Sequence, residues 1–246
     1  MLLLAFDTAT SAVTVALHDG STVIAEESGV DARKHGELLA VSIENVLASV
    51  GASEADLTGI AVGTGPGPYT GLRAGLVTAR VMASVLGLRL DGICSLDVIA
   101  AAAVGADAAI GTTGEVGEAG AIGAAGEVGE AGEVGDAGDQ EFLVATDARR
   151  REVYWARYTS EGARIAGPSV DKPAELPAGL RVAGEGAVIY PELGARAIGP
   201  RFPSAAQLAV LAVGRYAAGQ PQQPAEPLYL RRPDAREPGR PKRVTP

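Results

Sequence analysis

The chain begins with short apolar runs separated by turn residues. Residues 2–8 form an apolar run that ends in Asp-Thr, a pattern typical of a strand buried on both faces. At 12–17 larger apolar residues alternate with smaller ones, Asp19-Gly20 is a two-residue hairpin signal, and 22–26 resumes the extended pattern. These features predict a buried first strand that is followed by a β-hairpin.

The period then becomes helical. At 36–50 apolar residues recur at spacings of three and four, which predicts an amphipathic helix. A buried strand at 58–63 leads through a loop rich in glycine and proline into a helix at 70–86. A strand at 89–93 and a helix at 96–104 follow. The resulting order, βββαβαβα, predicts a layered α/β domain.

A glycine repeat interrupts this pattern. Glycine stands at every third position from Gly111 to Gly138, without the proline that gives collagen its rigidity. Nine acidic residues and no basic ones lie between Asp107 and Glu141. So few apolar groups cannot offset an ordering cost of ~1–2 kcal/mol per residue. We therefore expect a disordered acidic insertion at 105–140.

The second half of the chain has weaker extended patterns and one clear helix. Strands are predicted at 142–146, 152–158, 164–170 and 181–183, and a helix at 204–218. The expected organisation is an N-terminal lobe at 1–104, the insertion at 105–140, a second lobe at 141–203, a helix at 204–219 that packs back on the first lobe, and a tail rich in proline and arginine at 220–246.

Composition narrows the function classes. The formal net charge is −9, but removing the nine acids from Asp107 to Glu141 from the total of 30 leaves 21 acidic residues against 21 basic ones. This neutral body lacks the basic field that nucleic-acid binders need. A single cysteine excludes a disulfide framework, and no apolar stretch reaches the ~20 residues of a membrane span. We expect a cytoplasmic protein that makes no membrane contact and whose mature chain begins at Met1.

Two segments could in principle bind phosphate. Asp7, Thr8 and Thr10 follow the first strand, where nucleotide-binding proteins of the actin class carry a glycine-bearing turn, but Ala9 replaces that glycine. They remain weak nucleotide candidates beside the alternative that they satisfy the backbone of the turn. The loop at 63–73 lacks the Gly-Lys-Ser/Thr ending of a P-loop.

The helix after this loop carries a row of small residues, Gly71, Gly75, Ala79 and Ala83. Glycine within a helix costs ~1 kcal/mol relative to alanine, so the row requires a closely packed neighbour. That neighbour lies either within this chain or on another protein.

Catalytic constellations are missing from the sequence. His18 and His35 belong to no metal-binding motif, Cys94 has no histidine nearby in sequence, and no serine stands in a nucleophile elbow. We predict no catalytic residue, no metal site and no cofactor.

Five segments together resemble the bacterial TsaB (YeaZ) family. They are LAFDTAT at 4–10, KHGELL at 34–39, GPGPYTGLRAG at 65–75, DARRREVYW at 147–155 and PLYLR at 227–231. Their order and spacing also agree, and the resemblance covers 1–104 and 141–232. The chain departs from the family at Lys34, where serine is frequent, and at Arg151, where glycine is usual.

The resemblance implies a degenerate actin-like ATPase fold (ASKHA, ribonuclease-H-like) with two βββαβα-type lobes. It also implies a non-catalytic scaffold subunit of the complex that makes threonylcarbamoyladenosine at position 37 of tRNA. The implied partners are a TsaD homologue, TsaE indirectly, and a second copy of the chain, with tRNA reached only through the complex. The alternative is an active small-molecule kinase or ATPase of the same fold.

The family pairs through the helices equivalent to 36–50 and 70–86. The residues implied at that interface are His35, Leu38, Leu39, Ser42, Gly71, Leu72, Arg73, Gly75, Thr78, Ala79 and Met82.

Overall fold

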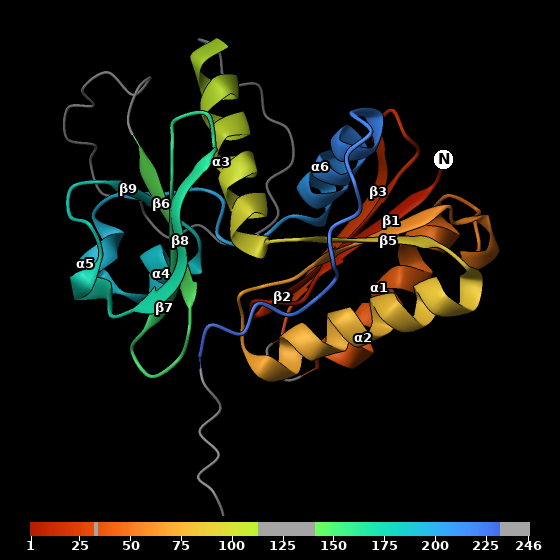
Figure 1. Cartoon of the computed structure of the whole chain (residues 1–246), viewed down its shortest axis with the longest axis horizontal. Helices are drawn as coiled ribbons and strands as arrows, with labels where there is room; N and C mark the ends of the chain where they lie inside the picture. Colours follow the sequence, from red (N-terminus) through yellow and green to blue (C-terminus); the bar gives the residue numbers. More distant parts are fainter. Residues whose placement is uncertain (32–33, 113–140, 232–246) are drawn as a thin grey trace, which may run out of the picture.

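The computed structural model describes residues 1–31, 34–112 and 141–231. They form two five-stranded sheets, each covered by helices (Figure 1). The repeat from residue 113 onward and the end of the chain from residue 232 lie outside the described residues. The expectation of a disordered insertion therefore concerns residues that are mostly not described.

The first sheet has the strand order β3-β2-β1-β4-β5. β2 is antiparallel to both β1 and β3, and β4 is parallel to both β1 and β5. The strands are β1 (Leu3–Asp7), β2 (Ala12–His18), β3 (Val23–Val30), β4 (Gly59–Gly63) and β5 (Arg89–Ile93).

Helices cover both faces of this sheet. Successive side chains of a strand point to opposite faces, so Leu4 and Phe6 pack with α1 (His35–Ser49) and α2 (Tyr69–Leu86). Leu3 and Ala5 pack on the other face with α6 (Ala205–Ala217). Every residue of β1 is therefore buried, as its uninterrupted apolar sequence predicts.

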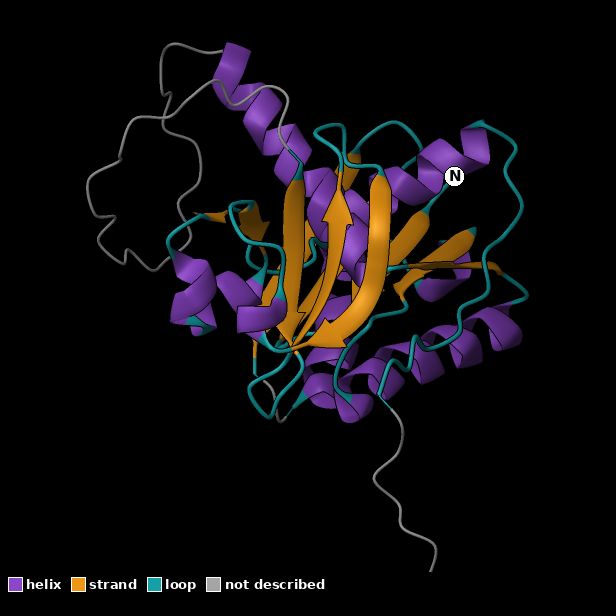
Figure 2. Ribbon diagram, turned by 60° about the vertical axis from the view of Figure 1, so that its left-hand side comes forward, coloured by secondary structure: helices purple, strands orange, loops and turns teal. Residues whose placement is uncertain are grey.

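The second sheet repeats the topology of the first. Its order is β10-β9-β6-β7-β8, with β7 antiparallel to β6 and β8, and β9 parallel to β6 and β10. Figure 2 shows these strands together with the helices around them. The strands are β6 (Phe142–Asp147), β7 (Val153–Tyr158), β8 (Arg164–Asp171), β9 (Arg181–Ala183) and β10 (Ala197–Ile198).

Helix α3 (Ser95–Thr112) joins the two halves. Val98 belongs to the apolar cluster of the first sheet, whereas Leu96 and Ile99 belong to a cluster with strands of the second. The helix extends past residue 104, where the sequence analysis ended it, into the segment assigned to the insertion.

Several short elements were not predicted. They are α4 (Glu185–Ile189), α5 (Pro191–Gly194), β10 and the 3-10 turns Glu54–Asp56 and Pro173–Glu175. Elements of two to five residues contain too few positions to establish a period.

The segment predicted to be a tail from residue 220 is attached to the first lobe as far as it is described. We call residues 220–231 the C-terminal strap. The Gly92 amide donates to the Gln223 carbonyl at 3.1 Å, and the Leu228 amide donates to the Thr64 carbonyl at 2.9 Å. The strap then reaches the second lobe, where Arg231 pairs with Glu152. Backbone hydrogen bonds therefore fix the described part of the segment predicted to be a tail.

Candidate functional site

The β1–β2 turn, which carries the weak nucleotide candidates, is closed. Asp7 is fully buried, and its carboxylate accepts hydrogen bonds from the Ala9 amide at 2.7 Å and from Ser95 Oγ at 2.5 Å. Burial raises the pKa of Asp7 from 3.8 to about 6, although both hydrogen bonds oppose that rise. The carboxylate is therefore held by the fold and does not face an open site.

Thr8 and Thr10 are occupied in the same way. Thr8 Oγ1 donates to the Gly71 carbonyl at 2.8 Å and accepts from the Gly75 amide at 3.1 Å. Thr10 Oγ1 accepts from the Ala12 amide at 3.2 Å, and His35 Nε2 lies 2.8 Å from the Thr10 carbonyl oxygen. These contacts agree with the alternative in which the turn residues satisfy backbone groups.

The glycine-rich loop between β4 and α2 packs directly on this turn. A Cβ atom on Gly67 would lie 2.0 Å from the Ala9 carbonyl oxygen, and one on Gly63 would lie 1.7 Å from Asp7 Oδ2. Glycine is thus required here for close packing, and the loop occupies the space above the turn.

A carboxylate from the second lobe reaches the end of the turn. Glu185 is 6% exposed and accepts a hydrogen bond from Ser11 Oγ at 2.7 Å. Arg201 lies 3.5 Å from the same carboxylate. The Ser11 hydroxyl is therefore already bound to a carboxylate that is itself paired with an arginine.

The row of small residues on α2 faces the interior of this chain. A Cβ atom on Gly75 would lie 2.5 Å from Thr8 Oγ1, and one on Gly71 would lie 2.6 Å from the Thr8 carbonyl oxygen. The close neighbour that the glycines require is therefore the β1–β2 turn. These residues are not available on the surface of the chain.

The residues that the resemblance implies at the interface divide into buried and exposed members. The members that are buried within the chain's own fold are Leu39, Ser42, Gly71, Leu72, Gly75 and Ala79. Arg73 is exposed, and His35, Leu38, Thr78 and Met82 are partly exposed. Sequence spacing left open whether the small residues contact this chain or another protein, because it does not reveal which helix face packs inward.

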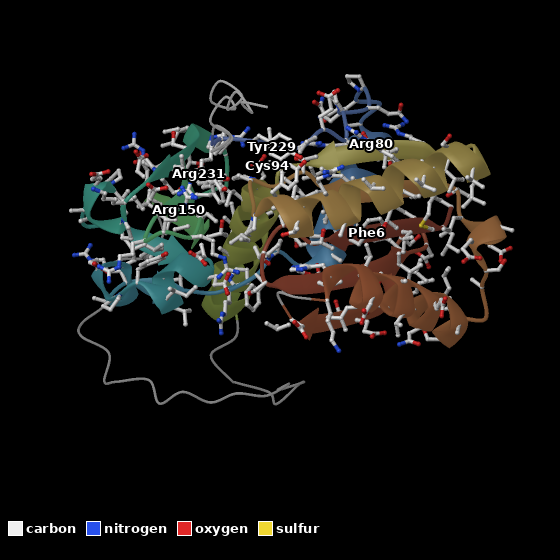
Figure 3. All side chains as sticks on the ribbon, turned by 90° about the horizontal axis from the view of Figure 1, so that it is seen from below. Phe6, Arg80, Cys94, Arg150, Tyr229 and Arg231 are labelled. Carbon is white, nitrogen blue, oxygen red and sulfur yellow. The ribbon has the colours of Figure 1, made fainter. Side chains whose placement is uncertain are left out.

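The outward face of α2 carries a different row. Val77, Val81 and Val85 recur every four residues and are 51%, 56% and 77% exposed. Val41 of the neighbouring α1 is 52% exposed. Figure 3 looks onto α1 and α2 lying side by side. We call Val77, Val81 and Val85 the valine row, which sequence reasoning missed although the i, i+4 spacing was visible.

The surroundings of His18 and Cys94 indicate structural roles for these two side chains. His18 Nδ1 accepts a hydrogen bond from the Gly20 amide at 2.9 Å. Burial, together with the nearby negative charge of Asp97, raises the pKa of Cys94 to about 11, so its thiol is not activated. Within residues 1–31, 34–112 and 141–231, no group of three or more potential ligands is arranged to hold a metal ion.

No helix in the described part of the chain has both the length and the hydropathy needed to cross a membrane.

Comparison with known sequences gives consistent likenesses. Residues 21–112 match the family model described as TsaD: tRNA N6-adenosine threonylcarbamoyltransferase. The chain is 40% identical over 237 residues to an uncharacterized protein of Mycobacterium tuberculosis, covering 95% of this chain and 93% of that protein. It is 27% identical over 250 residues to the tRNA threonylcarbamoyladenosine biosynthesis protein TsaB of Escherichia coli, covering 94% and 95%.

Solved structures share the architecture. YeaZ from Pseudomonas aeruginosa superimposes with a TM-score of 0.69 at 24% identity, covering 93% of this chain and 100% of that one. A second Pseudomonas aeruginosa structure, described as similar to peptidase YeaZ, gives a TM-score of 0.71 at 24% identity, with coverage of 94% and 99%. The fold is therefore the two-lobed, actin-like fold of these proteins.

Proposed function

The chain belongs to the TsaB (YeaZ) family, and from that premise we propose that it is the non-catalytic subunit that binds and supports a TsaD-type transferase. Membership of this family assigns the chain a role in threonylcarbamoyladenosine biosynthesis in tRNA. The proposal concerns what the chain does within that process, and its main support is the valine row.

The valine row supports a docking face on the outward side of α2. Three β-branched apolar side chains, each at least half exposed, follow one another along a single helix face, and Val41 of α1 is also more than half exposed. Apolar groups gathered in this way lose solvent contact favourably when a partner covers them. We propose that the outward face of α1 and α2 is the contact surface.

A TsaD-type lobe is the partner that we favour. The N-terminal part of this chain matches the TsaD family model, and it is 37% identical over 79 residues to the tRNA N6-adenosine threonylcarbamoyltransferase of Geotalea uraniireducens. Because the match to the family model spans α1 and α2, we expect a TsaD-type protein to carry an equivalent helix pair, and a pseudo-twofold contact of one pair on the other is then available to both. A second copy of this chain would compete for the same face.

The surroundings of the polar groups favour a non-catalytic role. The Asp7 carboxylate is enclosed, the Ser11 hydroxyl is bound to Glu185, and the Cys94 thiol has a raised pKa. These features argue against the alternative of an active small-molecule kinase or ATPase, which needs an open phosphate turn.

We expect the purified chain alone to transfer no threonylcarbamoyl group to adenosine 37 of unmodified tRNA. Adding the TsaD homologue of the same organism, with the other components of the pathway, should give product. The measurement is nucleoside analysis of the tRNA after the reaction. Modified adenosine formed in the absence of a TsaD-type protein would contradict the non-catalytic assignment.

Val81→Glu is expected to weaken binding to the TsaD homologue by about thirtyfold or more. An unpaired carboxylate in a closed interface costs at least about 2 kcal/mol, and 1.4 kcal/mol corresponds to a factor of ten. Because Val81 is 56% exposed in the single chain, the melting temperature should stay close to that of the wild type. Titration calorimetry would measure the affinity.

Val188→Glu is the matched control for this experiment. Val188 lies on α4 of the second lobe and is 59% exposed, so the same charge is added to a similar environment away from α1 and α2. It should leave the affinity unchanged. Equal binding by both variants would locate the docking face elsewhere.

A further inference from the structure

The edge of the first sheet at β3 pairs with no further described segment. None of the eight residues of this strand is buried, and Ile24 and Val30 are 37% and 64% exposed. An edge strand directs alternate N–H and C=O groups away from its sheet. Backbone donors and acceptors are therefore available along β3.

The other sheet edges in the described part of the chain are protected. The Gly92 amide of β5 donates to the C-terminal strap, and β10 has two residues. β8 contains Pro168, which has no N–H, and its pairing with β7 is interrupted by two register shifts. Short strands, proline, irregular pairing and a covering segment all prevent an edge from accepting another strand. Within residues 1–31, 34–112 and 141–231, β3 is the edge that has none of these protections along its length.

A groove of about 550 Å³ lies beside this open edge. Its walls come from β2, β3 and the segment that leads into α6, with Val30 and Phe202 among the apolar side chains that line it. Thr14 Oγ1 donates to the Pro203 carbonyl at 3.0 Å and so holds that segment against β2. Successive side chains of a strand point to opposite faces, so every second side chain of an added strand would face the groove.

Two carboxylates at the centre of β3 make this edge negative. Glu26 and Glu27 both line the groove, and Glu26 is exposed. Glu27 accepts hydrogen bonds from Ser42 Oγ at 3.0 Å and from Asn45 Nδ2 at 3.3 Å, which are neutral groups that leave its charge in place. The edge therefore favours a strand that carries positive charge.

The cation that lines the groove is already engaged. Arg201 lies 3.5 Å from the Glu185 carboxylate, and its guanidinium is 4.8 Å from the centroid of the Phe202 ring. Its charge is paired within the chain and does not neutralise the two glutamates of β3.

A second copy of this chain is disfavoured as the added strand. If two β3 strands paired antiparallel about their centres, Glu26 of each would lie opposite Glu27 of the other. Like charges directly opposite each other destabilise a strand pair, whereas opposite charges stabilise it. Lysine or arginine at these two positions would replace the repulsion with attraction.

We propose that β3 accepts, as an added strand, an extended segment of another protein that carries lysine or arginine opposite Glu26 and Glu27. Main-chain hydrogen bonds supply the affinity of such pairing, and the groove selects an apolar side chain beside Val30. This inference goes beyond the proposed function, because it concerns a sheet edge and not the outward face of α1 and α2.

The probe for this edge is a capped peptide of sequence Val-Thr-Thr-Lys-Lys-Thr-Val. Aligned antiparallel with residues 24–30, it places its lysines opposite the two glutamates and its valines opposite Ile24 and Val30. Amide hydrogen exchange of the full chain, followed by mass spectrometry, should slow at 23–30 when the peptide is added and stay unchanged at the β8 edge, 164–171. A peptide with proline in place of each threonine lacks backbone donors and should give no protection.

Charge variants test the selectivity. A peptide with glutamate in place of both lysines should bind at least about tenfold more weakly, measured by fluorescence anisotropy of labelled peptides. Glu26→Lys should weaken binding of the lysine peptide by roughly fivefold and strengthen binding of the glutamate peptide. Glu192→Lys is the matched control, because Glu192 is an exposed glutamate on α5 of the second lobe. It should leave both affinities unchanged.

The docking face and the strand edge are separated by Val81→Glu, which should bind the lysine peptide as the wild type does. The proposal is overturned if the lysine peptide gives no protection at 23–30, or if the glutamate peptide protects this strand equally. A wild-type dimer that Glu26→Lys dissociates would also overturn it, because a second copy would then occupy the edge.

Discussion

Gly67→Ala is expected to destabilise the fold by about 3 kcal/mol or more. The new Cβ atom would lie 2.0 Å from the carbonyl oxygen and 2.8 Å from the carbonyl carbon of Ala9. These are backbone atoms, which cannot rotate away as a side chain can, so either the loop or the β1–β2 turn must move. At ~2–4 °C per kcal/mol for a chain of this size, the melting temperature should fall by roughly 6–12 °C.

Gly214→Ala is the matched control, because the same substitution at this position should not lower the stability of the fold. Gly214 lies within α6, and its added Cβ atom would have no neighbour within 4 Å. Alanine is favoured over glycine in a helix by ~1 kcal/mol, so this variant should be slightly more stable than the wild type. Thermal unfolding of both variants would measure the contrast. A Gly67→Ala protein as stable as the wild type would contradict the close packing of the loop on the turn.

The free energy of unfolding of the wild type is expected to fall by roughly 3 kcal/mol between about pH 4 and pH 7, because of Asp7. The Asp7→Asn variant should not show this fall. The pKa of Asp7 is about 6 in the folded protein, against 3.8 for the ordinary carboxyl. Each unit of difference corresponds to 1.36 kcal/mol, so the figure follows from a shift of about two units. Its cause is the burial of the ionised carboxylate.

The sign of this effect follows from proton binding. The folded state binds the Asp7 proton more tightly than the unfolded state does. The bound proton therefore stabilises the fold fully below pH 3.8, and this stabilisation is lost as the pH rises through 6. An asparagine amide can still accept from the Ala9 amide and donate to Ser95 Oγ, so the packing is preserved. The difference in unfolding free energy between the two proteins, measured in urea at several pH values, isolates this group.

Asp19→Asn is the matched control, because the contribution of Asp19 to stability should change with pH in the opposite direction. Asp19 is exposed in the β2–β3 hairpin, and hydrogen bonds from the amides of Thr22 and Ser21 lower the pKa of its carboxyl. The contribution of Asp19 should therefore be present near neutral pH and decline in acid. If the Asp7 and Asp19 variants showed the same pH trend, the buried state of Asp7 would be wrong.

Local patterns sufficed for the elements of the first lobe. The apolar run at 2–8, the hairpin signal at Asp19-Gly20 and the helical period at 36–50 each act over a few residues, and the structure has β1, the β2–β3 hairpin and α1 at these positions. The motifs around Asp7 and the glycine-rich loop likewise identified the family. Such features are visible in sequence because neighbouring residues determine them.

The direction in which α2 faces was decided by tertiary packing. Two rows on this helix share the spacing of four, one of small residues beginning at Gly71 and one that includes Val77 and Val81. Spacing alone does not distinguish them, and hydrophobicity favours burying the valines. The small residues are buried instead, because Thr8 approaches the helix backbone too closely for any side chain to fit between them.

Long-range contacts also decided what surrounds the candidate sites. Ser95 bonds to Asp7 across 88 residues of sequence, and Ser11 bonds to Glu185 across 174. The strap brings Tyr229 onto Tyr69, and the β6–β7 turn places Arg149 beside them, where these residues line one cavity. The sequence by itself therefore determined the local elements and the family, whereas burial of the β1–β2 turn and formation of the cavity depend on contacts between residues far apart in the sequence.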